Sequence, residues 1–129
     1  ARIMEKGLCE RLVQVGIRTL SEHQAAQIEK YGVELIRMFE LEKLTSLKME
    51  GPVYISLDLD VFDPAFVPGV SHHEAGGMSP RELINFLLKA NLNLIGADIV
   101  EYNPFRDQSE ITAALASKML KELVAKMIE

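Results

Sequence analysis

The stretch Val53-Tyr-Ile-Ser-Leu-Asp-Leu-Asp-Val-Phe-Asp-Pro64 decides the fold that we expect for this chain of 129 residues. It opens as a continuous apolar strand over 53–59, between the turn-forming pairs Gly51-Pro52 and Asp63-Pro64. Residues 94–100 predict a second buried strand. Strands that are apolar on both faces are typical of a parallel sheet covered by helices.

Helical patterns alternate with these strands along the whole chain, and this alternation favours the α/β class. We therefore predict a three-layer α/β/α arrangement with a mainly parallel sheet, and a single α/β unit over 1–129. The remaining elements expected are strands at 11–17 and 33–39, and helices at 22–31, 40–49, 80–90 and about 109–128. The first helix is expected to be capped by Ser21 and to stop at Gly32, the second has leucines at 41, 44 and 47 on one side, and the third is expected to begin with a capping box of Ser79 and Glu82.

Composition excludes several classes of partner. The net charge is −5 and no basic cluster is present, which argues against a nucleic-acid partner. No apolar run approaches the roughly 20 residues that span a bilayer, so no membrane partner is expected. The single cysteine, Cys9, cannot form an internal disulfide.

Two strand ends carry acidic residues that point to chemistry. Asp58 and Asp60 stand at positions i and i+2, so on a strand both carboxylates would project from one face, and a divalent cation would relieve their repulsion. The alternative is a turn cap or a lysine pair. Glu101 ends the later strand, level with this pair, and Asp98 lies earlier and is expected to be more buried. Asp98 suits either a ligand-orienting role or a structural hydrogen bond.

For the other polar residues we expect structural or solvent-exposed positions. Asp63, before Pro64, is expected to form a turn. His72, His73 and Glu74 lie in a Gly/Pro-rich loop, where solvated polarity is favoured over lining a site. His23 is expected on the surface of a helix.

Two long motifs resemble the ureohydrolase family of arginases and agmatinases. Ser56-Leu-Asp-Leu-Asp-Val-Phe-Asp-Pro-Ala-Phe-Val-Pro-Gly69 is similar to the family signature S-x-D-x-D-x-x-D-P-x-x-x-P-G, and residues 96–104 are similar to its later G-x-D-x-x-E-x-N-P segment. The segment 71–77 most resembles the plant-type arginase branch. The resemblance covers the whole chain and implies a partial arginase-like fold.

The resemblance implies a binuclear manganese hydrolase that cleaves L-arginine to ornithine and urea. Asp58 would bridge two Mn²⁺ ions and Asp60 would bind one of them, and a metal-bound hydroxide would be the nucleophile. Glu101 would hold the guanidinium group of the substrate, and Asp98 would orient a ligand. Family members form trimers or hexamers, so a homo-oligomer is expected for the complete protein.

The resemblance also implies an incomplete site. The G-G-D-H and D-A-H-x-D segments, which supply the other metal ligands, are absent, leaving two of six ligands. The chain opens at Ala1 in what reads as the end of a helix, so we interpret it as a C-terminal portion that is inactive alone. A plant-type arginase would be mitochondrial and other members cytoplasmic.

Three alternatives remain at this stage. Agmatine or another guanidino compound can replace arginine as the substrate. A haloacid-dehalogenase-type phosphatase also places D-x-D at a strand end, although the contexts of Asp63 and Glu101 fit it less well. A truncated chain that serves only subunit association is the non-enzyme alternative.

Overall fold

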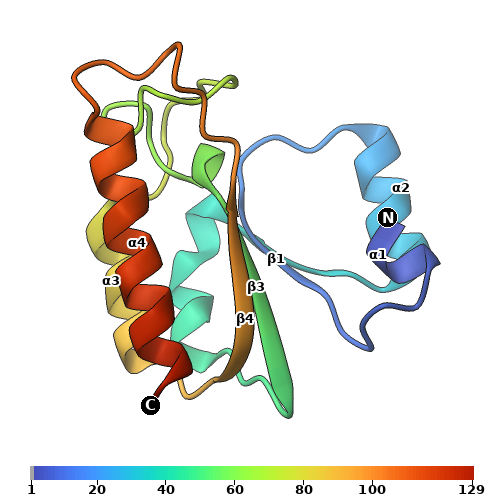
Figure 1. The fold of residues 1–129 in the computed structure, drawn as a ribbon. Coiled ribbons are helices and arrows are strands. Elements are labelled where there is room, and N and C mark those ends of the chain that lie inside the picture. The colour runs from blue at the N-terminus through green and yellow to red at the C-terminus, as the bar shows by residue number, and fades with distance from the viewer. Residues whose placement is uncertain (1) are drawn as a thin grey trace. The chain divides into compact units, whose positions relative to one another are not determined.

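The computed structural model describes residues 2–129 and divides the chain into two compact units, Ala1–Lys43 and Leu44–Glu129. Each unit contains one pair of parallel strands (Figure 1). The α/β class and the parallel pairing are therefore confirmed. The expectation of a single unit over 1–129 stays a prediction.

The first unit is built around the parallel strands β1 and β2, which pair from Val13 opposite Glu34 and shift register between Val15 and Ile17. Helix α2 connects them. Ser21 caps it by accepting from the Gln24 N–H, and Gly32 ends it at φ 60°, a conformation that glycine adopts without steric cost. The elements are α1 (Arg2–Glu5), β1 (Val13–Ile17), α2 (Glu22–Tyr31) and β2 (Glu34–Arg37).

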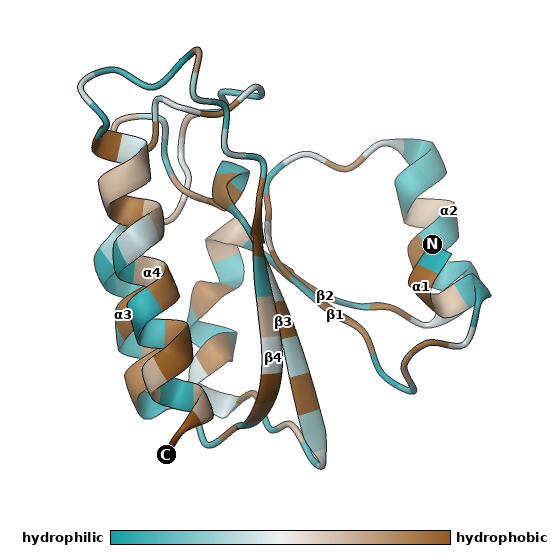
Figure 2. Ribbon diagram, viewed as in Figure 1, coloured by the Kyte–Doolittle hydropathy of each residue, from teal (hydrophilic) through white to brown (hydrophobic). Residues whose placement is uncertain are grey.

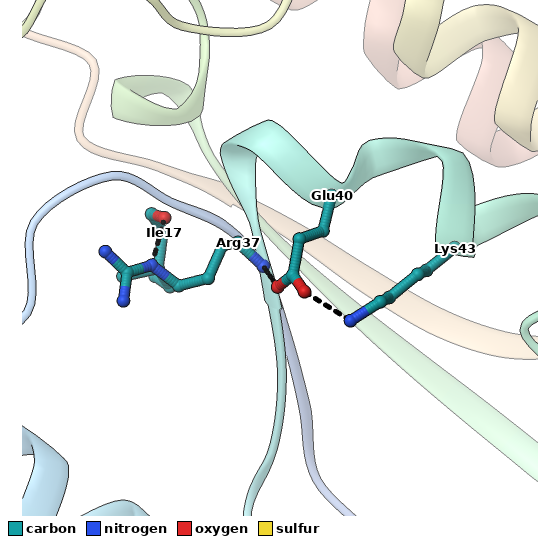
Figure 3. Close-up of polar contacts among 4 residues, drawn as sticks. All are labelled: Ile17, Arg37, Glu40 and Lys43. Atoms are coloured by element: carbon teal, nitrogen blue, oxygen red, sulfur yellow. Dashed lines mark hydrogen bonds and ion pairs between the residues drawn. The ribbon is translucent and has the colours of Figure 1, made fainter.

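The segment after β2 differs from the expected helix over 40–49. It is a 3₁₀ helix, η1 (Met38–Ser46), kinked at Glu40, where φ is −119° and ψ is 22°. The Glu40 carboxylate accepts from the Arg37 N–H at 3.3 Å and pairs with Lys43, while the Arg37 Nε donates to the Ile17 carbonyl at 3.2 Å (Figure 3). Leucine spacing alone suggested an α-helix, but these local hydrogen bonds favour a tighter, bent turn.

The second unit holds the acidic strand ends. Its strands pair in parallel from Pro52 opposite Asn93 to Asp58 opposite Val100, so both strands finish at the same edge of the sheet. The loops that follow β3 and β4 lie together at this edge (Figure 1). The elements are β3 (Pro52–Asp58), η2 (Leu59–Val61), α3 (Pro80–Lys89), β4 (Asn93–Val100) and α4 (Ile111–Met127).

Helices α3 and α4 lie side by side against one face of this strand pair. Along β3 apolar and polar residues alternate (Figure 2), and Val53 and Leu57 are buried on the helix side. The opposite face is exposed: Tyr54 is 59% exposed and the neighbouring Ile95 65%. Within this unit, helices therefore cover only one face of the strand pair. The core consists of Val53, Leu57, Leu59, Phe62, Val67, Val70, Met78, Ile84, Leu87, Leu94, Met119 and Leu123.

In this unit, the start of α3 agrees with the prediction from sequence and the start of α4 differs from it. Ser79 caps α3 and forms the expected capping box with Glu82. Helix α4 was expected from about Ser109, but Ser109 and Glu110 have φ values of 56° and 57°, outside right-handed helical geometry, so the helix begins at Ile111. Among the helices of residues 2–129, none has the length and apolar character needed to cross a membrane.

Candidate metal centre

The two aspartates of the D-x-D pattern belong to different elements. Strand β3 ends at Asp58, and Asp60 lies in the single turn of η2. Asp58 Oδ1 accepts the Asp60 N–H at 2.8 Å and so caps that turn, while Leu59 between them is completely buried. The expectation that the two carboxylates share one strand face is therefore wrong, because the strand ends at Asp58 and Asp60 lies in the turn that follows. Asp58 thus caps a turn, as its alternative interpretation expected, and its role as a metal ligand stays a prediction.

Asp60 lies in a cluster with His72 and Glu101. One ligand atom from each residue falls within 4.8 Å of the other two. The His72 Nδ1 is 3.6 Å from the Asp60 Oδ2, and the Asp60 Oδ1 is buried. Among residues 2–129, Asp58 is not a member of this cluster. The structure thus brings together Asp60 and Glu101, both singled out from sequence, and adds His72.

Glu101 has an unusual backbone conformation for its residue type. It directly follows β4 and has a φ of 67°, in the left-handed region that is costly for side chains other than glycine and asparagine. Such backbone strain gathers at functional sites, where the surrounding structure enforces it. In this protein the left-handed residue, Glu101, lies where the chain leaves β4, and its side chain belongs to the cluster.

The loop between η2 and α3 is held closed by one carboxylate. Asp63 Oδ2 accepts the N–H groups of Gly76 at 2.7 Å and Gly77 at 3.2 Å, and Oδ1 accepts the Ala65 N–H at 2.9 Å. The expected role of Asp63 in a turn is confirmed. Sequence reasoning did not foresee that the same side chain would join the two ends of the loop.

A second set of contacts ties the middle of this loop to the segment after β4. The Asn103 N–H donates to the Gly69 carbonyl at 2.8 Å, and its Nδ2 donates to the Ser71 Oγ at 3.0 Å. The Gly69 N–H donates to the Oγ1 of Thr112, a residue with no exposed surface, at 2.7 Å. These bonds place His72, which follows Ser71, next to Glu101, two residues before Asn103.

The N-cap residue of α4, Glu110, makes no capping hydrogen bond with its side chain, and Asp107 supplies the cap instead. Its two carboxylate oxygens accept the N–H groups of Thr112 and Ala113, each at 3.0 Å. Desolvation raises the pKa of Asp107, but these N–H donors, the Thr112 hydroxyl and the Tyr102 hydroxyl together hold it below its ordinary value. Desolvation, and secondarily the bond to Asp107, raises the pKa of Tyr102. The only sequence signal for this cap was an aspartate shortly before a helical pattern.

Asp98 lies on the exposed face of the strand pair and not in the cluster. It accepts from the Ser56 Oγ at 2.6 Å and from the Tyr54 hydroxyl at 3.2 Å. The expectation of a more buried side chain is wrong, since the residue is exposed. Desolvation first, and then this hydrogen bond, raises the pKa of Tyr54. A role for Asp98 in orienting a ligand stays a prediction.

The three histidines differ in their contacts. His23 is exposed on α2, as expected. The His73 Nε2 lies 2.8 Å from the Pro68 carbonyl, whereas the neighbouring His72 faces Asp60. The side chain of His72 is 85% exposed, so its expected solvation is correct, but its place in the cluster was missed. An irregular loop has no periodicity from which that direction could be inferred.

The donor set is chemically suited to a divalent cation. Carboxylate oxygens suit Mg²⁺, Ca²⁺ and Mn²⁺, and imidazole nitrogen extends the set to Zn²⁺ and other transition ions. The cluster offers both donor types at the rim where parallel strands end, which is where open α/β sheets bind ligands. Fold and site together define an α/β protein with a cluster of side chains that could hold a metal ion.

Comparison with known sequences identifies the family. The chain matches the arginase family over residues 1–125, and it belongs to that family. It is 48% identical to a mitochondrial arginase of Medicago truncatula, over 98% of this chain and 40% of that protein. It is 36% identical to an agmatinase of Bacillus anthracis, over 89% of this chain and 42% of that protein. The chain therefore spans about two fifths of the length of these relatives.

Solved structures agree with the sequence comparison. The arginase from Medicago truncatula matches with a TM-score of 0.87 and 43% identity, over 98% of this chain and 42% of that chain. A triple mutant of the Trypanosoma brucei arginase-like protein, solved with Mn²⁺ bound, matches with a TM-score of 0.90 and 30% identity, over 99% and 46% of the two chains. The partial arginase-like fold is confirmed, and the phosphatase alternative is set aside.

Proposed function

We propose that this chain is the C-terminal part of a binuclear manganese hydrolase that cleaves L-arginine to ornithine and urea. The observation that supports the proposal most directly is the meeting of Asp60 and Glu101 at one edge of the sheet, in a chain of the arginase family. The chain spans only 40% of a relative's length, so the activity belongs to the complete protein.

In this proposal Asp58 and Asp60 are the manganese ligands that the chain contributes. Carboxylates on a turn that follows a strand are suitable hard donors for Mn²⁺. When bound, the two ions supply a water nucleophile at neutral pH. Asp98 has an indirect role: its bond to Ser56 fixes the strand two residues before Asp58.

Glu101 is the group that we assign to the substrate. A carboxylate accepts two parallel N–H bonds from a planar guanidinium, which gives both binding energy and orientation. The left-handed backbone at Glu101 directs the chain toward Asp60, so the bound guanidinium would lie beside the manganese ligands. Positioning of this kind accounts for a large part of catalysis between bound groups.

A hybrid enzyme tests the proposal. The C-terminal two fifths of the Medicago truncatula arginase would be replaced by this chain, and urea release from arginine would be measured. We expect activity from the hybrid and none from the chain alone. Glu101→Gln should abolish turnover while retaining bound manganese, measured by metal analysis of the purified protein. A folded, manganese-loaded hybrid with no urea release, or one in which Glu101→Gln is fully active, would contradict the proposal.

Agmatine is the second candidate substrate, favoured by the 36% identity to the Bacillus anthracis agmatinase. Both substrates present the same guanidinium to Glu101 and differ at the other end of the molecule. The ratio of kcat/KM for arginine and agmatine in the same hybrid decides between them. The higher identity to plant arginases makes arginine the first choice.

Subunit association is the third candidate, and one surface feature favours it. A groove of about 310 Å³ lies between β4 and α4, lined by apolar residues that include Leu120, Val124 and Met127. Leu120 is 55% exposed and Val124 48%. If the chain serves only as a partner for other subunits, it should co-purify with a full-length arginase and leave the specific activity of that enzyme unchanged.

We further propose that the complete protein is a homo-oligomer, a trimer or hexamer, and that it is mitochondrial. The compartment is supported by the names of the plant relatives, which are mitochondrial arginases in Medicago truncatula and Arabidopsis thaliana. Light scattering of the hybrid and fractionation of cells that express the native gene test these two statements separately.

A further inference from the structure

We infer that Tyr54 is a positioning residue, which together with Gly96 fixes the register of β4 against β3 and so sets where Glu101 lies. Tyr54 and Gly96 are Cα partners on the two neighbouring strands. The inference rests on the proposed function in one respect, the assignment of Glu101 to the substrate. It adds to that function two residues that act through the alignment of the strands.

The two strands do not pair residue for residue. Val53 lies opposite Leu94, whereas the next residue, Tyr54, lies opposite Gly96. Strand β4 therefore carries one extra residue, Ile95, at this point. An extra residue of this kind is a β-bulge, and bulges beside functional sites redirect the side chains that follow them. Every later pairing of the two strands depends on this one.

The bulge decides which face of the strand pair Asp98 occupies. Leu94 is only 5% exposed, and strict alternation from it would place Asp98 on the same buried face, because residues four positions apart on a strand share a face. In the structure Asp98 is exposed and lies opposite Ser56. A slip of one residue reverses the faces of all side chains that follow. The observed register therefore keeps a carboxylate out of the core.

Tyr54 holds this register through both its ring and its hydroxyl group. The ring lies over Gly96: a Cβ at residue 96 would stand 2.9 Å from the ring atoms Cδ2 and Cε2, so a glycine is needed there. The Tyr54 hydroxyl donates to the Asp98 Oδ2 at 3.2 Å, and the Ser56 Oγ donates to the Oδ1 at 2.6 Å. A slip of one residue would put a side chain under the ring and break both hydrogen bonds.

The register reaches the candidate site through Glu101. Glu101 directly follows β4, whereas Asp60 lies in the turn after β3, so the distance between them depends on the alignment of the two strands. One residue of a strand spans about 3.3 Å. A misplacement of about 1 Å can already cost roughly 100-fold in rate. Asp58 and Asp60 both belong to β3 and its turn, so a slip of β4 displaces the substrate-binding group and leaves the proposed manganese ligands in place.

The hybrid enzyme described above tests the inference. Gly96→Ala should push the Tyr54 ring off β4, and Tyr54→Ala should remove it. We expect each variant to raise the KM for arginine at least about tenfold while the manganese content stays unchanged, because only Glu101 is displaced. Tyr54→Phe keeps the ring and loses the hydroxyl bond, so its KM should lie between those of the wild type and Tyr54→Ala. Ile95→Val, at the exposed bulge residue, is the matched control and should change the KM less than about twofold.

Two further measurements separate positioning from general destabilisation. In the chain itself, backbone nuclear Overhauser contacts between Ser56 and Asp98 report the register, and Gly96→Ala should abolish them. In the Tyr54→Ala background, Gly96→Ala should raise the KM no further, since the two residues act through one contact. The inference is overturned by additive effects of the two variants, by loss of manganese with an unchanged KM, or by register contacts that survive Gly96→Ala or are absent from the wild-type chain.

The outcomes also distinguish this inference from the proposed function. If the unaltered hybrid releases no urea, the proposed function fails, and the register contacts in the chain still decide whether Tyr54 and Gly96 set the alignment. If the hybrid is active and Gly96→Ala keeps the wild-type KM, the proposed function stands and only the inference about Tyr54 fails.

Discussion

The backbone N–H of Gly69 donates a 2.7 Å hydrogen bond to the side chain of Thr112, a residue without exposed surface. This bond joins the loop that carries His72 to the first turn of α4. The Thr112 hydroxyl also bonds to Asp107, the residue that caps the helix. Loop position and helix start are therefore set by one buried hydroxyl.

Gly69→Ala should destabilise the protein by about 1–3 kcal/mol, the usual cost of overpacking a tight contact. A Cβ at this position would lie 2.8 Å from the Asp107 Cβ and 2.8 Å from the Thr112 Oγ1. Chemical denaturation measures the change in the free energy of unfolding. Ala75→Ser, at an exposed position of the same loop, is the control and should be neutral. A neutral Gly69→Ala would show that the loop is not held against α4.

Thr112→Val should lower the free energy of unfolding by about 1–3 kcal/mol, because it leaves the buried Gly69 N–H without an acceptor. Thr112→Ser keeps the hydroxyl and loses only a methyl group, so it should retain most of the stability. Comparing the two variants by urea denaturation separates the hydrogen bond from packing. Equal losses in both variants would argue against a role for the hydroxyl.

Asp107 should make the protein less stable in acid. Its folded-state pKa is lowered, so its contribution to stability is complete above the unfolded-state pKa of about 4 and is lost as the pH falls through the lower folded-state value. Asp107→Asn should flatten the decline of Tm between about pH 5 and pH 2. Glu110→Gln, whose side chain makes no capping hydrogen bond, should leave the decline unchanged. An unchanged profile in Asp107→Asn would refute the assignment.

Asn103→Ala should lower the free energy of unfolding by about 0.5–1.5 kcal/mol, the usual contribution of one hydrogen bond, while leaving the helical content intact. The variant keeps the backbone bond from residue 103 to Gly69 and removes the side-chain bond to Ser71, so the backbone beside His72 becomes freer. Urea denaturation measures the free energy of unfolding and circular dichroism the helical content. Ser71→Ala removes the same bond from the other side, and the two variants should agree. Unequal effects of the two variants would show that the hydrogen bond between Asn103 and Ser71 is not the cause.

Much of the fold could be predicted because its signals are local. The Ser21 and Ser79 caps and the Gly32 stop depend on residues within one turn of each helix end, and the structure has them as expected. The start of α4 was harder to predict from the sequence. Its cap, Asp107, stands four residues before the helix, and the intervening Ser109 and Glu110 adopt left-handed conformations that the sequence does not signal.

The candidate site could be predicted only in part, for a similar reason. That Asp60 and Glu101 would meet followed from parallel strands ending at one edge. The placement of Asp58 and Asp60 on different elements did not follow, because residues 59–61 form a turn although their sequence resembles a continued strand. The position of His72 depends on contacts to Asn103 and Thr112, which are more than 30 residues away in the chain.

The hydrogen bonds that the Asp63 carboxylate accepts from Gly76 and Gly77 have a consequence for how the sequence of this loop can change. It closes residues 64–75 into a bounded segment whose two ends are fixed independently of what lies between them. Exchanges or length changes near Ser71 and His72 can therefore alter the groups displayed at the rim while the flanking strand and helix stay in register. Evolution of new specificities, and their selection in the laboratory, can act on this segment without first rebuilding the scaffold.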